Sequence, residues 1–283
     1  MKWAVGVMAA RRPISTWRET AFSLQKCGWN PTVFAEADVV EEIPYGILTN
    51  HPRIVRRPQS ADAVFTPAEI GPNGEFGNFQ NFVQTLADLL WLEPTADVLM
   101  VVEDDALFNT NTKRFVEEWL WPERHTGMMS LYCPESRPFH KLGRGLHKMT
   151  WAEWYGSLAV LFPREVVIKM LNAEILNNWQ TEEKPWRRRG GVKRAGKMTR
   201  TMGLSDWCFC PSLVKHYSPV ICDNQNSSYA LGSGMNIGPR QAMDFIGENT
   251  NPWNLFPRKR EPLTLDKLKA WDENELRSLG VIK

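Results

Sequence analysis

The sequence predicts an α/β protein with a mixed, mainly parallel sheet of the Rossmann type, flanked by helices. Two observations support this class. Short apolar runs of strand length alternate with amphipathic segments of helical length, and one apolar run, within Val98–Phe108, leads directly into three carboxylates. Such runs suit parallel strands buried on both faces, and open α/β sheets bind ligands beyond the carboxyl ends of their strands. We therefore expect a functional site at Glu103, Asp104 and Asp105.

The first elements of the chain are predicted to be a strand, a helix and a second strand. The apolar run Trp3–Met8 is followed by a capping box at Thr16 and Glu19, and Thr32–Phe34 forms the next apolar run. The loops after both strands are where such a sheet would hold a nucleotide. The candidate nucleotide-binding residues in these loops are Ala9, Ala10, Arg11 and Asp38. A dinucleotide cofactor is disfavoured, because the first loop has no glycine fingerprint.

A long amphipathic helix is predicted before the acidic strand, beginning near Asn78 and ending before Pro94. Its N-terminus offers free N–H groups to an anion, although capping is the more ordinary role for Asn78. The other expected elements are strands at Ile54–Val55, Gly127–Cys133 and Leu158–Phe162, and helices at Thr112–Trp121, at Pro163–Leu176 and, in two short pieces, after Thr264. The alternation of strands and helices therefore extends through the chain.

The acidic run Glu103, Asp104 and Asp105 needs a physical explanation, because three adjacent carboxylates repel one another. One of them takes up a proton, faces solvent or shares a cation. Oxygen ligands in a phosphate-handling site suit Mg²⁺ or Mn²⁺. The structural alternative is a solvated acidic turn that follows a core strand.

Gly156 lies in an aromatic stretch, after Trp154 and Tyr155. A glycine at the start of a strand permits the close approach of a ligand to the backbone, which would make these three residues acceptor-binding. Ordinary aromatic packing around the glycine is an equal alternative.

The segment Lys184–Arg200 carries eight basic residues and no acidic residue. It is interpreted as a solvated loop, as a lid over a diphosphate, or as a tract that neutralises nucleic-acid phosphates. The residues that would serve the second or third role are Arg187, Arg188, Arg189, Lys193 and Arg194.

Two chemically active residues follow the basic segment. Ser205 is expected to cap a short helical turn with Asp206 in its first turn, and a further segment leads to His216. Zinc binding by Cys208, Cys210, His216 and Cys222 is a minor alternative, because the spacing matches no usual pair of zinc ligands.

Composition bounds the other properties. The 283 residues have a net charge of +2 and are 43% hydrophobic, which suffices for a full core. Five irregularly spaced cysteines argue for reduced thiols, and no apolar run is long enough to cross a bilayer, so we expect a soluble cytoplasmic protein. We expect a nucleotide-binding half at residues 1–108, a catalytic half at residues 109–235 and a tail at residues 236–283.

Taken in order, these features resemble metal-dependent glycosyltransferases of the GT-A fold over about residues 1 to 230. The acids of VVEDDALF resemble that fold's Asp-x-Asp motif, with Glu103 in place of the first acid. Gly156 in WYGSLAVLF resembles its acceptor-side glycine loop, Asp206 in GLSDWCF its catalytic base, and His216 in PSLVKHYSP its C-terminal metal ligand. Pro219 departs from the pattern, because a glycine is frequent there, and the basic segment is not a hallmark of the family.

The resemblance implies a transferase that moves a hexose from a nucleotide-diphosphate sugar, most simply a UDP-sugar, to a hydroxyl acceptor. Asp105 and His216 would bind Mn²⁺ or Mg²⁺, and Glu103 or Asp104 would orient the ribose or a metal-bound water. Asp206 would deprotonate the acceptor, with inversion. The acceptor would be a surface saccharide or, given the basic segment, a hydroxymethylated pyrimidine in DNA. The alternatives are a nucleic-acid-binding module without activity and a nucleotidyltransferase.

Overall fold

The computed structural model describes residues 1–9, 15–36, 52–57, 75–121, 124–133, 143–150, 156–174, 176, 191–217, 245–255, 262–269 and 271. The strands are β1 (Trp3–Ala9), β2 (Thr32–Glu36), β3 (Arg53–Arg57), β4 (Val98–Glu103), β5 (Ala106–Phe108), β6 (Thr126–Ser130), β7 (Gly145–Met149), β8 (Ala159–Pro163), β9 (Ser205–Cys210) and β10 (Val214–His216). The helical segments are α1 (Trp17–Lys26), α2 (Glu75–Leu92), α3 (Thr112–Phe115), the π-helical turn η2 (Val116–Leu120), α4 (Arg164–Leu171), α6 (Gly191–Thr201), the 3₁₀ turn η3 (Pro252–Leu255) and α8 (Leu265–Leu268).

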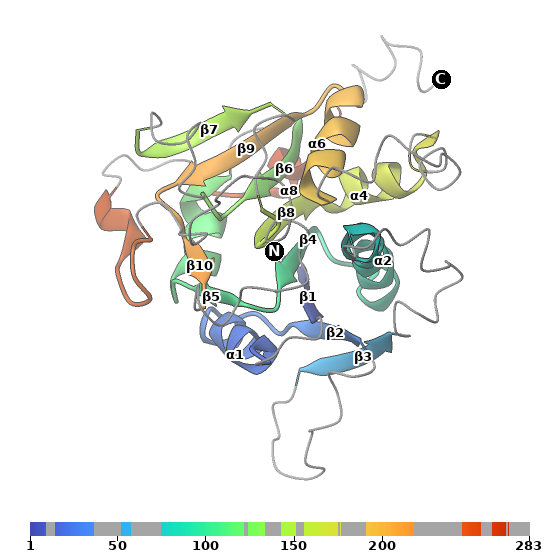
Figure 1. The fold of residues 1–283 in the computed structure, drawn as a ribbon. Coiled ribbons are helices and arrows are strands. Elements are labelled where there is room, and N and C mark those ends of the chain that lie inside the picture. The colour runs from blue at the N-terminus through green and yellow to red at the C-terminus, as the bar shows by residue number, and fades with distance from the viewer. Residues whose placement is uncertain are drawn as a thin grey trace, which may run out of the picture.

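Eight of the described strands form one mixed sheet in the order β3-β2-β1-β4-β8-β6-β9-β7 (Figure 1). The strands β3, β2, β1 and β4 are parallel to one another, and β6 is parallel to β9, whereas β8 and β7 run in the opposite direction. This confirms the predicted fold class, an α/β protein with a mixed sheet flanked by helices. The carboxyl ends of β1, β2, β4, β6 and β9 consequently lie at one edge, here called the carboxyl edge, and their starts lie at the amino edge.

Alternating side chains of β4 enter two separate apolar cores. Val98, Met100 and Val102 belong to one core, and Leu99 and Val101 belong to the other. This is the alternation that a strand buried on both faces must show. Helix α1 and the α3–η2 segment cover the first face, and α2, α4 and α6 cover the second.

Helix α1 shows how local sequence forms these layers. Trp17, Ala21 and Leu24 recur at helical spacing and are buried against the sheet. The helix ends because Gly28 adopts φ +86°, a left-handed conformation that lets Trp29 N donate to Leu24 O at 3.1 Å. The chain then turns back into β2 as the sequence predicts.

Four parts of the structure differ from the prediction. Ser205 begins strand β9 and not a helical turn, and the sequence does not predict β7. The short strands β5 and β10 form a separate antiparallel pair. The basic segment from residue 191 onward belongs to helix α6, whose apolar side packs into the second core; its residues 184–190 lie outside the described part of the chain.

Among the described residues, no helix combines the length and the hydropathy required to cross a membrane.

Candidate functional site

The turn after β4 places a buried carboxylate against a buried imidazole. Asp105 is the last residue of the two-residue turn between β4 and β5, and β10 pairs with β5 so that His216 is opposite Ala106. Asp105 Oδ2 lies 3.0 Å from His216 Nδ1, although the two residues are 111 positions apart in the sequence. Their exposed fractions are 2% and 8%. The structure therefore brings together the two residues that the sequence analysis assigned to one metal ion.

The backbone of the acidic turn is held by helix α1. The carbonyl oxygen of Asp104 accepts hydrogen bonds from the hydroxyls of Thr16, at 2.9 Å, and Thr20, at 2.8 Å. The Thr20 hydroxyl also accepts from Ala106 N at 2.9 Å. Thr16 does not cap α1 with its side chain as predicted, because its hydroxyl bonds to Asp104 instead. The first turn of α1 thus fixes the position of Asp105.

Glu103, the last residue of β4, is only partly buried. The hydroxyl of Ser157 donates a hydrogen bond to Glu103 Oε1, and Glu103 N donates to Leu158 O at 3.1 Å. Glu103 is opposite Met8 of β1, so the buried residue Ala9 lies beside it at the carboxyl edge. A nucleotide at this edge would meet Glu103 before the more deeply buried Asp105.

Gly156 makes a close approach to an aromatic ring. It has φ +73°, and a Cβ at this position would stand 3.0 Å from Tyr132 Cε1. The Tyr132 ring in turn contacts the His216 ring edge to face, with centroids 5.3 Å apart. The space at Gly156 is therefore filled by Tyr132, which favours the packing alternative over an approach by the acceptor.

Asp206 lies at the amino edge, on the second residue of β9. Asp206 pairs with Met128 of β6. The next residue of β6, Met129, pairs with Leu161 of β8, which in turn pairs with Met100 of β4. Asp206 is therefore level with Leu99, four residues before Glu103, which corresponds to about 13 Å along the strands and about 14 Å across three strand spacings. The structure does not bring Asp206 to the Asp105–His216 pair.

The neighbours of Asp206 hold its carboxylate in place by hydrogen bonds. Its carboxylate accepts from Met128 N at 3.2 Å and from the Thr199 hydroxyl at 2.8 Å, and its exposed fraction is 4%. A Cβ on Gly127 would stand 2.6 Å from Asp206 Oδ1, so little space surrounds this carboxylate. This geometry ties α6 to β6 and does not suit a base that must reach an acceptor hydroxyl.

The other predicted site residues are less informative. Arg194 lies within helix α6 and is 3% exposed, a position that does not favour the alternatives of a lid or a polyanion contact for this residue. Asn78 lies in α2 and Lys193 in α6, but their side chains are not described. The predicted residues outside the described part of the chain are Ala10, Arg11, Asp38, Trp154, Tyr155, Arg187, Arg188, Arg189 and Cys222.

Sequence reasoning missed three residues that contact the site: Thr20, Tyr132 and Ser157. Thr20 lies on the buried, mainly apolar face of α1, and a hydroxyl in such a position is a usable signal, because a buried polar group needs a partner. Ser157 directly follows Gly156 but carries no distinguishing pattern. Tyr132 looks like an ordinary core aromatic after β6.

A divalent cation is compatible with the donors present. Two ligand atoms that each bind an octahedral ion at about 2.1 Å, at right angles to one another, stand roughly 3 Å apart. Asp105 Oδ2 and His216 Nδ1 are 3.0 Å apart. Within the described ranges, no group of three or more His, Cys, Asp or Glu residues could hold a metal. A cation held by Asp105 and His216 alone would need substrate phosphates and water to complete its coordination. Zinc gains no support from the described Cys208 and Cys210.

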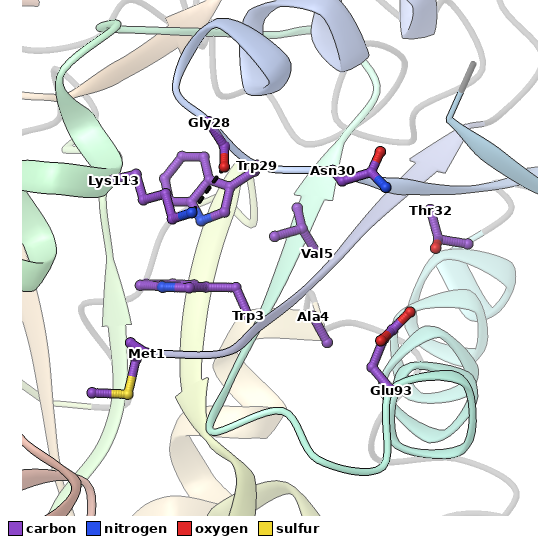
Figure 2. A pocket seen from close by; sticks show the side chains of 10 residues that line it. All are labelled: Met1, Trp3, Ala4, Val5, Gly28, Trp29, Asn30, Thr32, Glu93 and Lys113. Atoms are coloured by element: carbon purple, nitrogen blue, oxygen red, sulfur yellow. Dashed lines mark hydrogen bonds between the residues drawn. The ribbon is translucent and has the colours of Figure 1, made fainter. Parts of the chain in front are cut away.

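A cavity of about 270 Å³ lies at the amino edge, away from these residues (Figure 2). Figure 2 shows Trp3 and Trp29 on its walls, and Lys113 Nζ donates to Gly28 O at 2.8 Å beside them. None of the predicted site residues lines this cavity. It is therefore separate from the candidate site.

Comparisons with known proteins add little. No protein-family model and no curated protein sequence matches the chain. Among solved structures, the chain is similar to a protein from Bacillus anthracis described as a candidate glucose-1-phosphate thymidylyltransferase, in complex with sucrose. The TM-score is 0.41 and the identity 11%, over 81% of this chain and 92% of that one. At these values the function of this chain has to be argued from its own residues.

Proposed function

We propose that this protein is a metal-dependent transferase that uses a nucleotide-diphosphate sugar, with a UDP-sugar as the first donor to test. The observation that carries the proposal is the buried Asp105–His216 pair, 3.0 Å apart at the carboxyl edge of the sheet. This edge is where open α/β sheets bind their ligands. The Asp105 carboxylate suits either Mn²⁺ or Mg²⁺, whereas the His216 imidazole, as a nitrogen donor, suits the transition metal Mn²⁺ better than Mg²⁺.

The residues of the carboxyl edge have distinct tasks in this proposal. Asp105 and His216 would hold the cation, which when bound neutralises the charge of the departing diphosphate. Glu103 is partly exposed and hydrogen-bonded by Ser157, so it can accept a hydrogen bond from a ribose hydroxyl or a metal-bound water. Asp104 contributes its backbone carbonyl to Thr16 and Thr20 and so keeps the turn in place.

Asp206 has no part in the proposed chemistry, because it lies at the amino edge and its carboxylate accepts from Met128 N and Thr199. The acceptor base is consequently not assigned to it, and the inversion that the resemblance implied loses the residue on which it depended. Asp206 serves instead as a matched buried aspartate for control experiments.

The proposal is tested by titrating the purified protein with Mn²⁺ and measuring release of the nucleoside diphosphate from a panel of nucleotide sugars. We expect Asp105→Ala and His216→Ala to remove both metal binding and turnover, whereas Asp206→Asn retains metal binding. The proposal is wrong if the wild-type protein neither binds nor turns over any nucleotide sugar with Mn²⁺ or Mg²⁺, or if Asp105→Ala leaves nucleotide affinity unchanged.

The products identify the reaction class and the acceptor. Release of pyrophosphate from a nucleoside triphosphate would replace the proposal with nucleotidyl transfer. Labelled sugar is offered to DNA that contains hydroxymethylated pyrimidine and to oligosaccharides, and DNA binding is measured against salt concentration, because phosphate contacts make binding strongly salt-dependent. Strong DNA binding without affinity for nucleotide sugars would indicate a nucleic-acid-binding module.

A further inference from the structure

We infer that Ser157 and Tyr132 are positioning residues that hold the proposed metal site in shape, an inference that rests on the proposed function. Neither residue would touch the cation. Each contacts one of the groups that would bind the cation or the nucleotide, and each reaches it from a different strand end. Together with Gly156 they connect the two segments that carry Glu103 and His216.

Ser157 acts on Glu103. Its hydroxyl donates to Glu103 Oε1 across 54 sequence positions, and its exposed fraction is 7% while Glu103 is more exposed. A partly exposed glutamate rotates among several side-chain conformations unless a hydrogen bond selects one. The buried Ser157 hydroxyl therefore occupies Glu103 Oε1, and in this proposal Oε2 would accept from the ligand.

Tyr132 acts on His216. Its buried ring meets the imidazole edge to face, with centroids 5.3 Å apart and an interplanar angle of 84°. The same ring packs against Gly156, because Tyr132 Cε1 would stand 3.0 Å from a Cβ at that position, and the φ of +73° there also favours glycine. The imidazole is consequently held by its contact with the Tyr132 ring and by Asp105 at Nδ1.

These contacts form a closed series. Ser157 bonds to Glu103, and the adjacent Gly156 packs against Tyr132. Tyr132 contacts His216, and His216 contacts Asp105, which is two residues from Glu103. Backbone hydrogen bonds brace the same region, because Leu131 N donates to Ala159 O at 3.1 Å and Leu213 N donates to Leu131 O at 3.0 Å. Loss of the Ser157 or the Tyr132 side chain would therefore leave Glu103 or His216 less firmly oriented, without removing a metal ligand.

The experiment measures two affinities of the full chain, by calorimetry or by electron paramagnetic resonance: that for Mn²⁺ alone in Tyr132→Leu, and that for UDP at saturating Mn²⁺ in Ser157→Ala. We expect Tyr132→Leu to bind Mn²⁺ about tenfold more weakly, as substitutions behind metal ligands do. We expect Ser157→Ala to bind UDP about fivefold more weakly, because Glu103 loses the hydrogen bond that orients it. Ser157→Thr and Tyr132→Phe, which retain the hydroxyl and the ring respectively, should restore most of the affinity. Thermal unfolding identifies any variant that does not fold, and the Ser157 variants decide the matter if Tyr132→Leu is one of these.

A double-mutant cycle separates positioning from general stability. If Ser157 acts through Glu103, Ser157→Ala should have no further effect on UDP affinity in a Glu103→Ala background. Additive effects, or wild-type affinity for UDP in folded Ser157→Ala and for Mn²⁺ in folded Tyr132→Leu, would overturn the inference while leaving the proposed function intact. Absence of Mn²⁺ binding by the wild-type protein would instead overturn the proposed function, and the inference with it.

Discussion

Two buried aspartates, at opposite edges of the same sheet, differ in what their neighbours offer. Asp206 at the amino edge accepts hydrogen bonds from a backbone N–H and a threonine hydroxyl, and Gly127 leaves no space beside it. Asp105 at the carboxyl edge also accepts a hydrogen bond, from His216 Nδ1, but an imidazole nitrogen can exchange its proton for a metal ion, which a backbone N–H cannot do. Burial alone therefore does not mark a functional carboxylate. The useful distinction is that the neighbour of Asp105 is itself a common metal ligand.

The largest expected effect is the loss of metal binding at the carboxyl edge. Asp105→Ala should weaken Mn²⁺ binding by more than about 100-fold, because removing a ligand exceeds the effect of removing a supporting residue. Asp206→Asn should leave Mn²⁺ affinity within about twofold of wild type and lower stability by about 1–3 kcal/mol, because the amide presents a donor to existing donors. Calorimetric titration and urea unfolding measure both; a metal defect in Asp206→Asn would erase the contrast between the two edges.

The next effect is at Gly127, where overpacking should destabilise the amino edge. A Cβ there would stand 2.6 Å from Asp206 Oδ1 and 2.7 Å from Thr199 Cβ. Gly127→Ala should cost about 3 kcal/mol of unfolding free energy, as overpacking in a dense core does. Gly143→Ala is the matched control, because no atom lies within 4 Å of its added Cβ. Equal stability of the two variants in urea would contradict the crowded environment described for Asp206.

Thr20 provides a smaller effect that reaches the carboxyl edge through the backbone. Thr20→Val keeps the shape of the side chain but removes the hydroxyl that donates to Asp104 O and accepts from Ala106 N. We expect a loss of about 2 kcal/mol in urea unfolding, because buried polar groups lose a partner. Mn²⁺ affinity should fall as well, about tenfold. Thr201→Val, in the exposed last turn of α6, should change neither quantity appreciably.

The last effect is a pH dependence of stability near the amino edge, which is absent at neutral pH. Burial raises the pKa of the Cys27 thiol from 9.0 to about 12. The folded state therefore holds this proton more tightly than the unfolded state, so stability is unaffected below pH 9 and falls between pH 9 and about 12. The slope reaches about 1.4 kcal/mol per pH unit. Unfolding at several pH values, wild type against Cys27→Ala, measures it; identical slopes would contradict the raised pKa.

Much of the fold follows from local patterns in the sequence. The alternation in Val98–Glu103 and the helical spacing of Trp17, Ala21 and Leu24 predict β4 and α1 directly. The short strands β5, β7 and β10 were not predicted, since three to five residues carry too little periodicity to distinguish a strand from a loop. The segment around Asp206 was assigned to a helical turn, because Ser205 resembles an N-cap and its pairing with β6 is not visible locally.

The sequence by itself determined the longer periodic elements, such as β4 and α1, and that Glu103, Asp104 and Asp105 follow the buried residues of a strand. Covalent geometry sets these periodicities, so they can be read from neighbours in the chain. Only the tertiary structure decided at which edge each polar residue lies. Strand direction and register depend on hydrogen bonds between remote segments. These pairings placed His216 against Asp105 and left Asp206 at the opposite edge, four residues short of the level of Glu103.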